Sequence, residues 1–185
     1  AYADLEARAE SVEGWRPYRE VLEEVLRGLC NARGVSLGED EAGSLAKSLP
    51  GWPLFDDTRE ALERLGSAFG LAIVSNVDDD LFAGTRQVLG VEFDEVVTAE
   101  QARAYKPSLR PFELLFERLP CERKEILHLA QSLYHDHEPA RHLGLPSIRV
   151  DRPSRLPGRG VAPDTDLRPQ REVPDLASVA DFLGA

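Results

Sequence analysis

Most of this chain alternates helical periodicity with short apolar runs, and the runs end at polar residues. One run, at residues 71–74, stops at Ser75 and Asn76, and later runs are followed by Lys106 and by residues 131–136. Alternation at this spacing predicts β-α-β crossovers, and therefore a parallel sheet with helices on both faces. Ligands of such α/β sheets bind beyond the carboxyl ends of the strands. We therefore expect the three polar clusters to converge on one pocket.

The first quarter of the chain has a different pattern. Apolar residues recur at three- and four-residue steps over residues 12–31, which predicts an amphipathic helix, and a second helix is expected over residues 38–49. Residues 50–53 read Pro-Gly-Trp-Pro, which neither helix can continue through. The sequence therefore predicts a small all-helical cap over residues 1–52 and an α/β core over residues 53–185.

The core elements follow from the same patterns. The expected helices span residues 57–69, 79–89, 107–119, 137–143 and 175–183, and the expected strands span residues 71–75, 95–98, 126–130 and 147–150. Residues 153–174 are rich in Pro, Gly, Asp and Arg and are expected to be irregular.

Charge and hydropathy restrict the partners. A net charge of −11 disfavours binding to nucleic acid or to an anionic membrane, because both would repel the surface as a whole. No apolar stretch approaches the ~18 residues of a membrane span, and no basic leader is followed by an apolar segment. We expect a cytoplasmic protein whose partner is a small anionic substrate, attracted by a local positive charge. A homodimer through the cap helices is an open alternative.

Three short motifs resemble those of a known superfamily. Val74-Ser75-Asn76, Lys106-Pro107 and the segment Ser-Leu-Tyr-His-Asp at residues 132–136 are similar, in that order, to the second, third and fourth motifs of the haloacid dehalogenase-like hydrolases. The match is to the branch of 2-haloacid dehalogenase-type proteins with a helical cap, and it covers nearly the whole chain. The resemblance implies a Rossmann-like core, a mobile cap and hydrolysis through an aspartyl ester intermediate.

In that superfamily the nucleophilic Asp lies on the first core strand, near the start of the chain. The acidic residues near the start here, Asp4 and Glu6, follow no apolar strand. We therefore expect the nucleophile to be missing from these 185 residues, and no covalent catalysis from them alone.

The resemblance assigns catalytic roles to four residues. Ser75 and Asn76 would hydrogen-bond a carboxylate or phosphoryl oxygen, although Ser and Asn also form simple turns at strand ends. Lys106, at the rim of the pocket, would stabilise the nucleophile and developing negative charge, and Pro107 would be a favourable first residue of the next helix. Asp136 would orient Lys106 or a hydrolytic water. It would also serve as the N-cap of the helix expected to begin at residue 137.

Four further residues are candidates for binding substrate. In the cap, Arg16 and Tyr18 are placed to close over an anionic substrate, as cap residues do in this family. In the fourth motif, Ser132 and Tyr134 either line the pocket or shape its loop. His128 lies within an expected buried strand and is interpreted as a core histidine rather than a catalyst.

The fourth motif also bears on metal binding. Phosphatases of the superfamily typically carry an Asp where this chain has Gln131, and Mg²⁺ prefers carboxylate and water oxygens. We therefore expect no cofactor and no dedicated metal ligands, with any Mg²⁺ binding weakened by Gln131. We do not expect the adjacent His135, Asp136 and His137 to form a metal site, because successive side chains seldom converge on one ion.

These observations favour one function and leave two alternatives. The favoured function is that of a haloacid dehalogenase-like hydrolase acting on a small organic acid, with the missing carboxylate as nucleophile. The first alternative is a Mg²⁺-dependent phosphatase of small phosphorylated metabolites. The second is a noncatalytic module whose pocket still holds an anion.

Overall fold

The computed structural model describes residues 2–11, 14–152 and 165–185. Its α-helices are α1 (Tyr2–Glu10), α2 (Tyr18–Asn31), α3 (Ser44–Ser48), α4 (Thr58–Ala68), α5 (Asp79–Leu89), α6 (Ala99–Ala102), α7 (Arg110–Arg118), α8 (Glu138–Leu143) and α9 (Leu176–Leu183). Its strands are β1 (Ala72–Ser75), β2 (Glu95–Thr98), β3 (His128–Ala130), β4 (Ser147–Val150) and β5 (Glu172–Val173). Short 3-10 turns span Glu39–Glu41, Leu49–Gly51 and Arg123–Glu125, and a π-helical turn spans Leu133–His137.

The strands are parallel, as predicted, but they form two sheets instead of one. β1 pairs with β2, and β4 pairs with β3 on one side and β5 on the other. Among the described residues, no ladder joins β1 to β3. Within the described part of the chain, each of these two strands therefore has one edge without a neighbouring strand.

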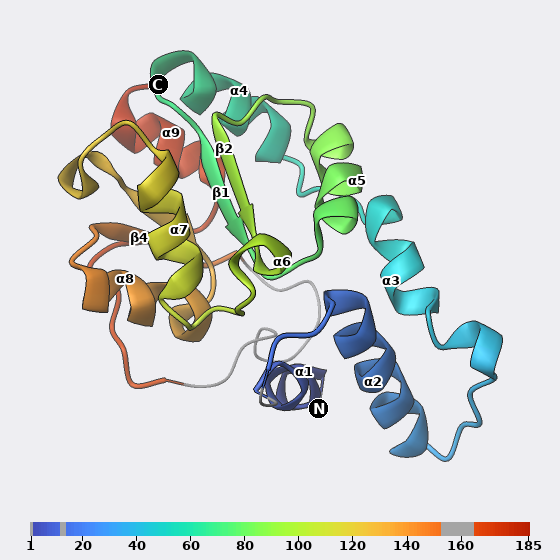
Figure 1. The fold of residues 1–185 in the computed structure, drawn as a ribbon. Coiled ribbons are helices and arrows are strands. Elements are labelled where there is room, and N and C mark those ends of the chain that lie inside the picture. The colour runs from blue at the N-terminus through green and yellow to red at the C-terminus, as the bar shows by residue number, and fades with distance from the viewer. Residues whose placement is uncertain (1, 12–13, 153–164) are drawn as a thin grey trace.

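Helices cover both faces of the strands, which confirms the predicted α/β class (Figure 1). On one face, α4 and α9 pack together and bury Leu65 and Val179 against Ile148 of β4. On the other face, α7 places Leu115 against Val97 of β2. Because side chains alternate across a strand, neighbouring residues of β1 and β2 contribute to different helix layers.

Helices α1 and α2 lie beyond the carboxyl ends of β1 and β2, whose arrows point toward them in Figure 1, and α3 packs beside α2. Their apolar residues share one cluster with Leu81, Ala99 and Tyr105 of the predicted core. The start of α2 is also tied to the buried Asp78, whose carboxylate accepts hydrogen bonds from Tyr18 N at 2.7 Å and Arg19 N at 3.1 Å. A carboxylate at a helix N-terminus is stabilising, and here it attaches α2 to the rest of the molecule.

Several predicted boundaries in the first quarter were wrong. The helix expected over 12–31 begins only at Tyr18, because Pro17 adopts the extended conformation that precedes the helix, and residues 12 and 13 lie outside the described residues. Helix α1 was not predicted. The helix expected over 38–49 is divided at Gly43 into a 3-10 turn and the short α3. The division of the chain into domains at residue 52 stays a prediction.

The core boundaries are closer to those predicted. Helix α5 and strand β2 have the expected limits, and α5 ends at Gly90 in the left-handed conformation that favours glycine. Helix α7 begins at Arg110, so Pro107 lies in the preceding turn and is not the first helical residue. Strand β5 lies within the segment expected to be irregular, of which residues 153–164 are outside the described part.

Asp57 links three separate parts of the core. Its carboxylate accepts hydrogen bonds from Arg152 Nη1 at 2.5 Å and from Leu176 N at 2.8 Å. Burial would raise the pKa of this carboxyl group, but its bonds to Arg152 and to the start of α9 lower the pKa overall. The contact joins the end of β4 to α4 and α9.

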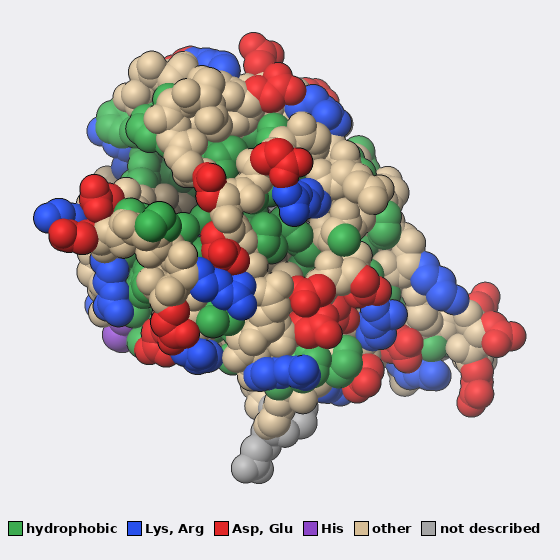
Figure 2. Space-filling view, turned by 45° about the horizontal axis from the view of Figure 1, so that its top comes forward, with side chains coloured by type: hydrophobic (Ala, Val, Ile, Leu, Met, Phe, Trp, Pro, Cys, Tyr) green, Lys and Arg blue, Asp and Glu red, His purple; other side chains and the backbone are tan. Residues whose placement is uncertain are grey.

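The surface carries charges of both signs, with acidic side chains beside basic ones on the face shown in Figure 2. No helix in the described part of the chain is both long enough and apolar enough to cross a bilayer.

Candidate active site

The ends of β1 and β3 are joined by a buried ion pair. Lys106 Nζ lies 2.7 Å from Asp136 Oδ1, and the exposed fractions of the two side chains are 11% and 9%. The same ammonium donates a hydrogen bond to Val74 O at 2.9 Å. One cation thus contacts the backbone of β1 and the turn that follows β3. Lys106 was expected at the rim of the pocket, but the structure buries it.

Asp136 is held as a carboxylate by its neighbours. Burial by itself would raise the pKa of this group, because burial disfavours the charged form. The charge of Lys106 and a 3.2 Å hydrogen bond from His128 Nε2 outweigh burial and lower the pKa below its usual range. Asp136 and Lys106 therefore neutralise one another, and Asp136 holds the ammonium in place.

Asn76 fixes the backbone of Lys106. Its Oδ1 accepts a hydrogen bond from Lys106 N at 2.8 Å, and its Nδ2 donates one to Lys106 O at 3.1 Å. Nδ2 also donates a longer bond to Glu10 Oε1 at 3.4 Å. The side-chain amide of Asn76, which follows β1, thus positions Lys106 at the expected pocket. Ser75, the last residue of β1, lies opposite Thr98 of β2.

A cavity of about 210 Å³ opens beside the ion pair, between the end of α1 and the residues around Lys106. It is lined by Ala7, Glu10, Ser11, Tyr105, Lys106, Pro107 and Tyr134. Two of the three N–H donors of the Lys106 ammonium are used by Val74 and Asp136, so among the described contacts one donor is left for a ligand. The site can therefore offer a fixed positive charge to a small acid or to a leaving anion.

The two cap residues expected to bind substrate do not line this cavity. Arg16 donates to Ala9 O at 2.9 Å and pairs with Glu24 at 2.7 Å, so its guanidinium fixes the end of α1 to α2. Tyr18 is buried, and its hydroxyl donates to Glu6 Oε1 at 2.6 Å. Both side chains hold the helical region together, and a role in binding substrate stays a prediction for them.

The two candidates in the fourth motif have different positions. Tyr134 lines the cavity, as expected. Ser132 is the N-cap of the π-helical turn, where its Oγ accepts a hydrogen bond from His135 N at 3.0 Å. This contact corresponds to the alternative in which Ser132 shapes the loop.

Sequence reasoning did not identify three residues at the site. His128 was interpreted as a core histidine, and it does pack against Phe112, but it also bonds Asp136. His135 and Glu10 approach one another at 3.6 Å from the turn after β3 and from α1. No local signal identified Glu10, because α1, on which it lies one turn after the buried Glu6, was itself not predicted.

A larger cavity, of about 410 Å³, lies between α8, the residues that precede β4 and residues 167–170. It contains none of the candidate catalytic or substrate-binding residues. Its larger size alone therefore does not make it the candidate site.

The side chains near the ion pair do not suit a divalent cation. No group of three or more His, Cys, Asp or Glu side chains in the described ranges could hold a metal ion. Gln131 is exposed, and the Asp136 carboxylate is already bonded to Lys106 and His128. Mg²⁺ would have to compete with an ammonium for the one buried carboxylate of the motif.

The chain is similar in sequence to a family of known enzymes. A family model described as haloacid dehalogenase-like hydrolase matches residues 43–150. (S)-2-haloacid dehalogenase H-109 of Pseudomonas putida is 27% identical over 169 residues, which cover 90% of this chain and 73% of that protein. (S)-2-haloacid dehalogenase 2 of Pseudomonas sp. strain CBS-3 is 29% identical over 167 residues, which cover 88% and 72%.

Solved structures with the same fold include an L-2-haloacid dehalogenase from Xanthobacter autotrophicus with chloropropionic acid covalently bound. Its TM-score is 0.84 at 19% identity, over 100% of this chain and 84% of that one. The putative HAD-hydrolase YfnB from Bacillus subtilis, bound to magnesium, has a TM-score of 0.79 at 21% identity, over 100% and 79%. At these identities the likeness shows the fold.

Proposed function

The chain belongs to the haloacid dehalogenase-like hydrolase family, and from this premise we propose that its site removes halide from a small halogenated organic acid. The observation that carries the proposal is the buried Lys106–Asp136 pair, which places a fixed ammonium at the strand ends and beside a small cavity. The curated relatives, which include several (S)-2-haloacid dehalogenases, support the same reaction class.

In the proposed reaction, a carboxylate attacks the carbon that bears the halogen. The C–halogen bond breaks, its electron pair leaves with the halide, and an ester forms between enzyme and substrate. Water then attacks the ester carbonyl, which releases the hydroxy acid and restores the carboxylate. Lys106 stabilises negative charge during these steps, Asn76 and Asp136 position Lys106, and Tyr134 contacts the substrate. Ser75 is proposed to hydrogen-bond the substrate acid.

The nucleophilic Asp of this mechanism is not assigned to any of the 185 residues. We propose that it lies on a further parallel strand, which would pair with the free edges of β1 and β3 and place its carboxylate near Lys106. The intact mass of the protein purified from its source, compared with 20.5 kDa for these residues, tests for such a segment. A cytoplasmic location and a homodimer stay predictions.

The proposal predicts chloride release from (S)-2-chloropropionate by the protein in its natural length. Release is expected to continue in the presence of a chelator, because no step is assigned to a metal ion. The 185-residue polypeptide alone is expected to release no chloride, because the attacking carboxylate is proposed to lie outside these residues. An ion-selective electrode measures the product directly.

The outcome that would favour the alternative phosphatase is equally specific. Phosphate release from a small phosphate ester that requires Mg²⁺ and stops with chelator, without chloride release from the halogenated acid, would contradict the proposal. The YfnB neighbour bound to magnesium is the observation that keeps this alternative under test. Tight binding of a small acid with neither reaction would indicate the noncatalytic module.

A further inference from the structure

A second carboxylate faces the cavity from the cap side. Glu10 is the last residue of α1, its side chain is 7% exposed, and it lines the cavity together with Lys106. Its Oε1 lies 3.4 Å from Asn76 Nδ2, and its Oε2 lies 3.6 Å from His135 Nε2. Both distances exceed the usual range for hydrogen bonds to a charged oxygen. Within the described residues, Glu10 is thus buried without a close donor.

Glu6, one turn earlier on the same helix face, is a buried carboxylate that does have short hydrogen bonds. Its Oε1 accepts hydrogen bonds from Tyr18 Oη at 2.6 Å and from Tyr2 Oη at 3.2 Å. Burial and, to a smaller extent, the negative charge of Glu10 nevertheless raise the pKa of Glu6 overall. The two acids share one helix and one face, but only Glu6 has short bonds to hydroxyl groups. The difference is that Glu10 borders empty space.

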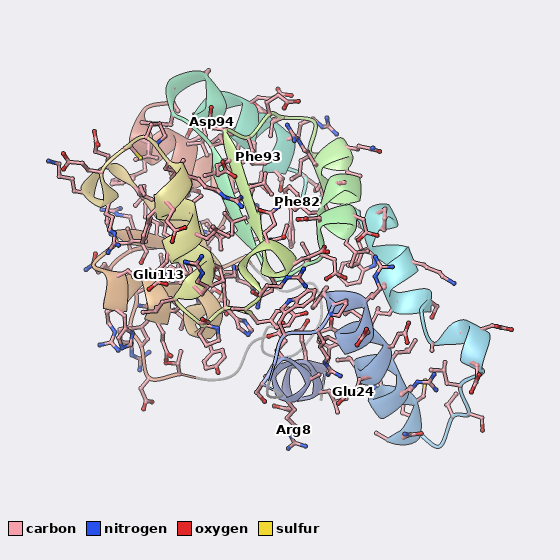
Figure 3. All side chains as sticks on the ribbon, in the orientation of Figure 1. Arg8, Glu24, Phe82, Phe93, Asp94 and Glu113 are labelled. Atoms are coloured by element: carbon pink, nitrogen blue, oxygen red, sulfur yellow. The ribbon has the colours of Figure 1, made fainter. Side chains whose placement is uncertain are left out.

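Among the described residues, no Lys or Arg pairs with Glu10, and His135 compensates its charge only when protonated. Lys106 is already paired with Asp136. Arg16 is bonded to the end of α1 and to Glu24. Arg8, on the same helix as Glu10, is exposed and points away from the core in Figure 3. Glu10, Lys106 and the Asp136 that pairs with Lys106 therefore carry a net charge of −1 together, if His135 is neutral.

A site of this charge binds an acid that lacks a hydrogen-bond donor less tightly than an acid that carries one. A second carboxylate close to Glu10 is repelled, and a buried carboxylate with only long contacts to donors costs free energy that a ligand with a donor would recover. The cavity of about 210 Å³ has room for a molecule of a few heavy atoms, since one water takes about 30 Å³. A small molecule with an acid at one end and a donor at the other fits both charges.

We propose that Glu10 determines specificity by selecting small acids whose opposite end donates a hydrogen bond, as an amino or hydroxyl group does. The acid end faces Lys106, and the donor end gives Glu10 the short hydrogen bond that Asn76 and His135 do not supply. This inference takes from the proposed function only that the substrate is a small acid. The preference for a donor group is argued from Glu10. It adds a substrate class: halogenated acids that carry an amino or hydroxyl group.

Three probes of equal size and without halogen test the inference by binding. They are β-alanine, β-hydroxypropionate and butyrate, which differ in an ammonium, a hydroxyl or a methyl group at the end away from the acid. By titration calorimetry, the protein is expected to bind β-alanine or β-hydroxypropionate at least about tenfold more tightly than butyrate. Which of the two binds more tightly distinguishes an amino from a hydroxyl substrate.

Glu10→Gln is the decisive variant, because it removes the charge and keeps the shape. It is expected to reduce the preference for β-alanine over butyrate about tenfold, which corresponds to ~1.4 kcal/mol. Asp4→Asn removes the same charge from an exposed position of the same helix and is expected to leave the preference unchanged. Glu10→Ala gives the same test if the Gln variant does not fold.

Equal affinities for the three probes, no binding of the two donor probes at millimolar concentration, or an unchanged preference in both Glu10 variants would overturn the inference. Failure of the proposed function is a separate result, because it is measured as chloride release. A preference that depends on Glu10, without chloride release, would leave the selectivity in place and remove only the dehalogenase.

Discussion

Replacing Lys106 with alanine is expected to lower the free energy of unfolding by about 3–5 kcal/mol, because it leaves Asp136 as a buried carboxylate without its cation. This expectation follows from burial. A lysine at a solvated pocket rim would cost little. Urea denaturation at neutral pH measures the effect. Lys124→Ala, at a side chain that is 76% exposed, is the matched control and is expected to have little effect.

The pH dependence of this loss has a definite sign. In the wild type the pKa of Asp136 is held low, so the stability it contributes is present above about pH 4 and is lost as pH falls below that value. Without Lys106, burial dominates and the pKa of Asp136 rises. The loss in the free energy of unfolding of the Lys106→Ala variant should therefore be largest at neutral pH. The difference from the wild type should become smaller in acid. A difference independent of pH would show that lost packing, not charge, is responsible.

The double variant Lys106→Met/Asp136→Leu should recover most of the lost stability. Replacing a buried ion pair by apolar side chains of similar size is often neutral or stabilising, whereas removing one partner is not. A double variant as unstable as the single one would contradict the account of Asp136 as an unpaired charge.

Chloride release should not return with the stability. In the protein of natural length, Lys106→Met and the double variant are both expected to lose at least about a hundredfold in chloride release, as removal of a charge-stabilising donor does in other enzymes. The double variant separates catalysis from folding, because it is expected to be folded and inactive. Lys124→Met should retain activity. Release within about tenfold of the wild type in the double variant would remove Lys106 from the mechanism.

Much of the fold could be predicted because local signals agreed with the tertiary structure. Helix α5 follows the acidic residues at its start and ends at Gly90, which supplies the left-handed conformation, and β2 is an isolated β-branched run. Helix α1 was missed because its buried face contains Glu6 and Glu10, which interrupt the apolar pattern. The short hydrogen bond that stabilises the buried Glu6 carboxylate comes from Tyr18, twelve residues away. Such a partner is not visible in a local window.

The candidate site shows the same division. The strand-end rule brought Asn76, Lys106 and Asp136 together correctly, because it depends only on topology. The partners of individual side chains could not be read in this way. Arg16 is used to fix α1, and Ser132 caps a turn, because each lies within reach of backbone groups whose positions depend on packing. The position of the Glu10 carboxylate at the cavity also depends on how α1 packs, and the local sequence does not indicate it.

The central claim is that a carboxylate of the protein, and not water, attacks the carbon that loses its halogen. A single turnover of (S)-2-chloropropionate with excess enzyme in ¹⁸O-labelled water tests it most directly, with mass spectrometry of both product and protein. The account predicts that the first hydroxy acid carries unlabelled oxygen at the new hydroxyl and that the label enters one Asp of the protein. A labelled first product together with a protein that carries no label would mean that water attacks the carbon directly. That result would contradict the ester mechanism.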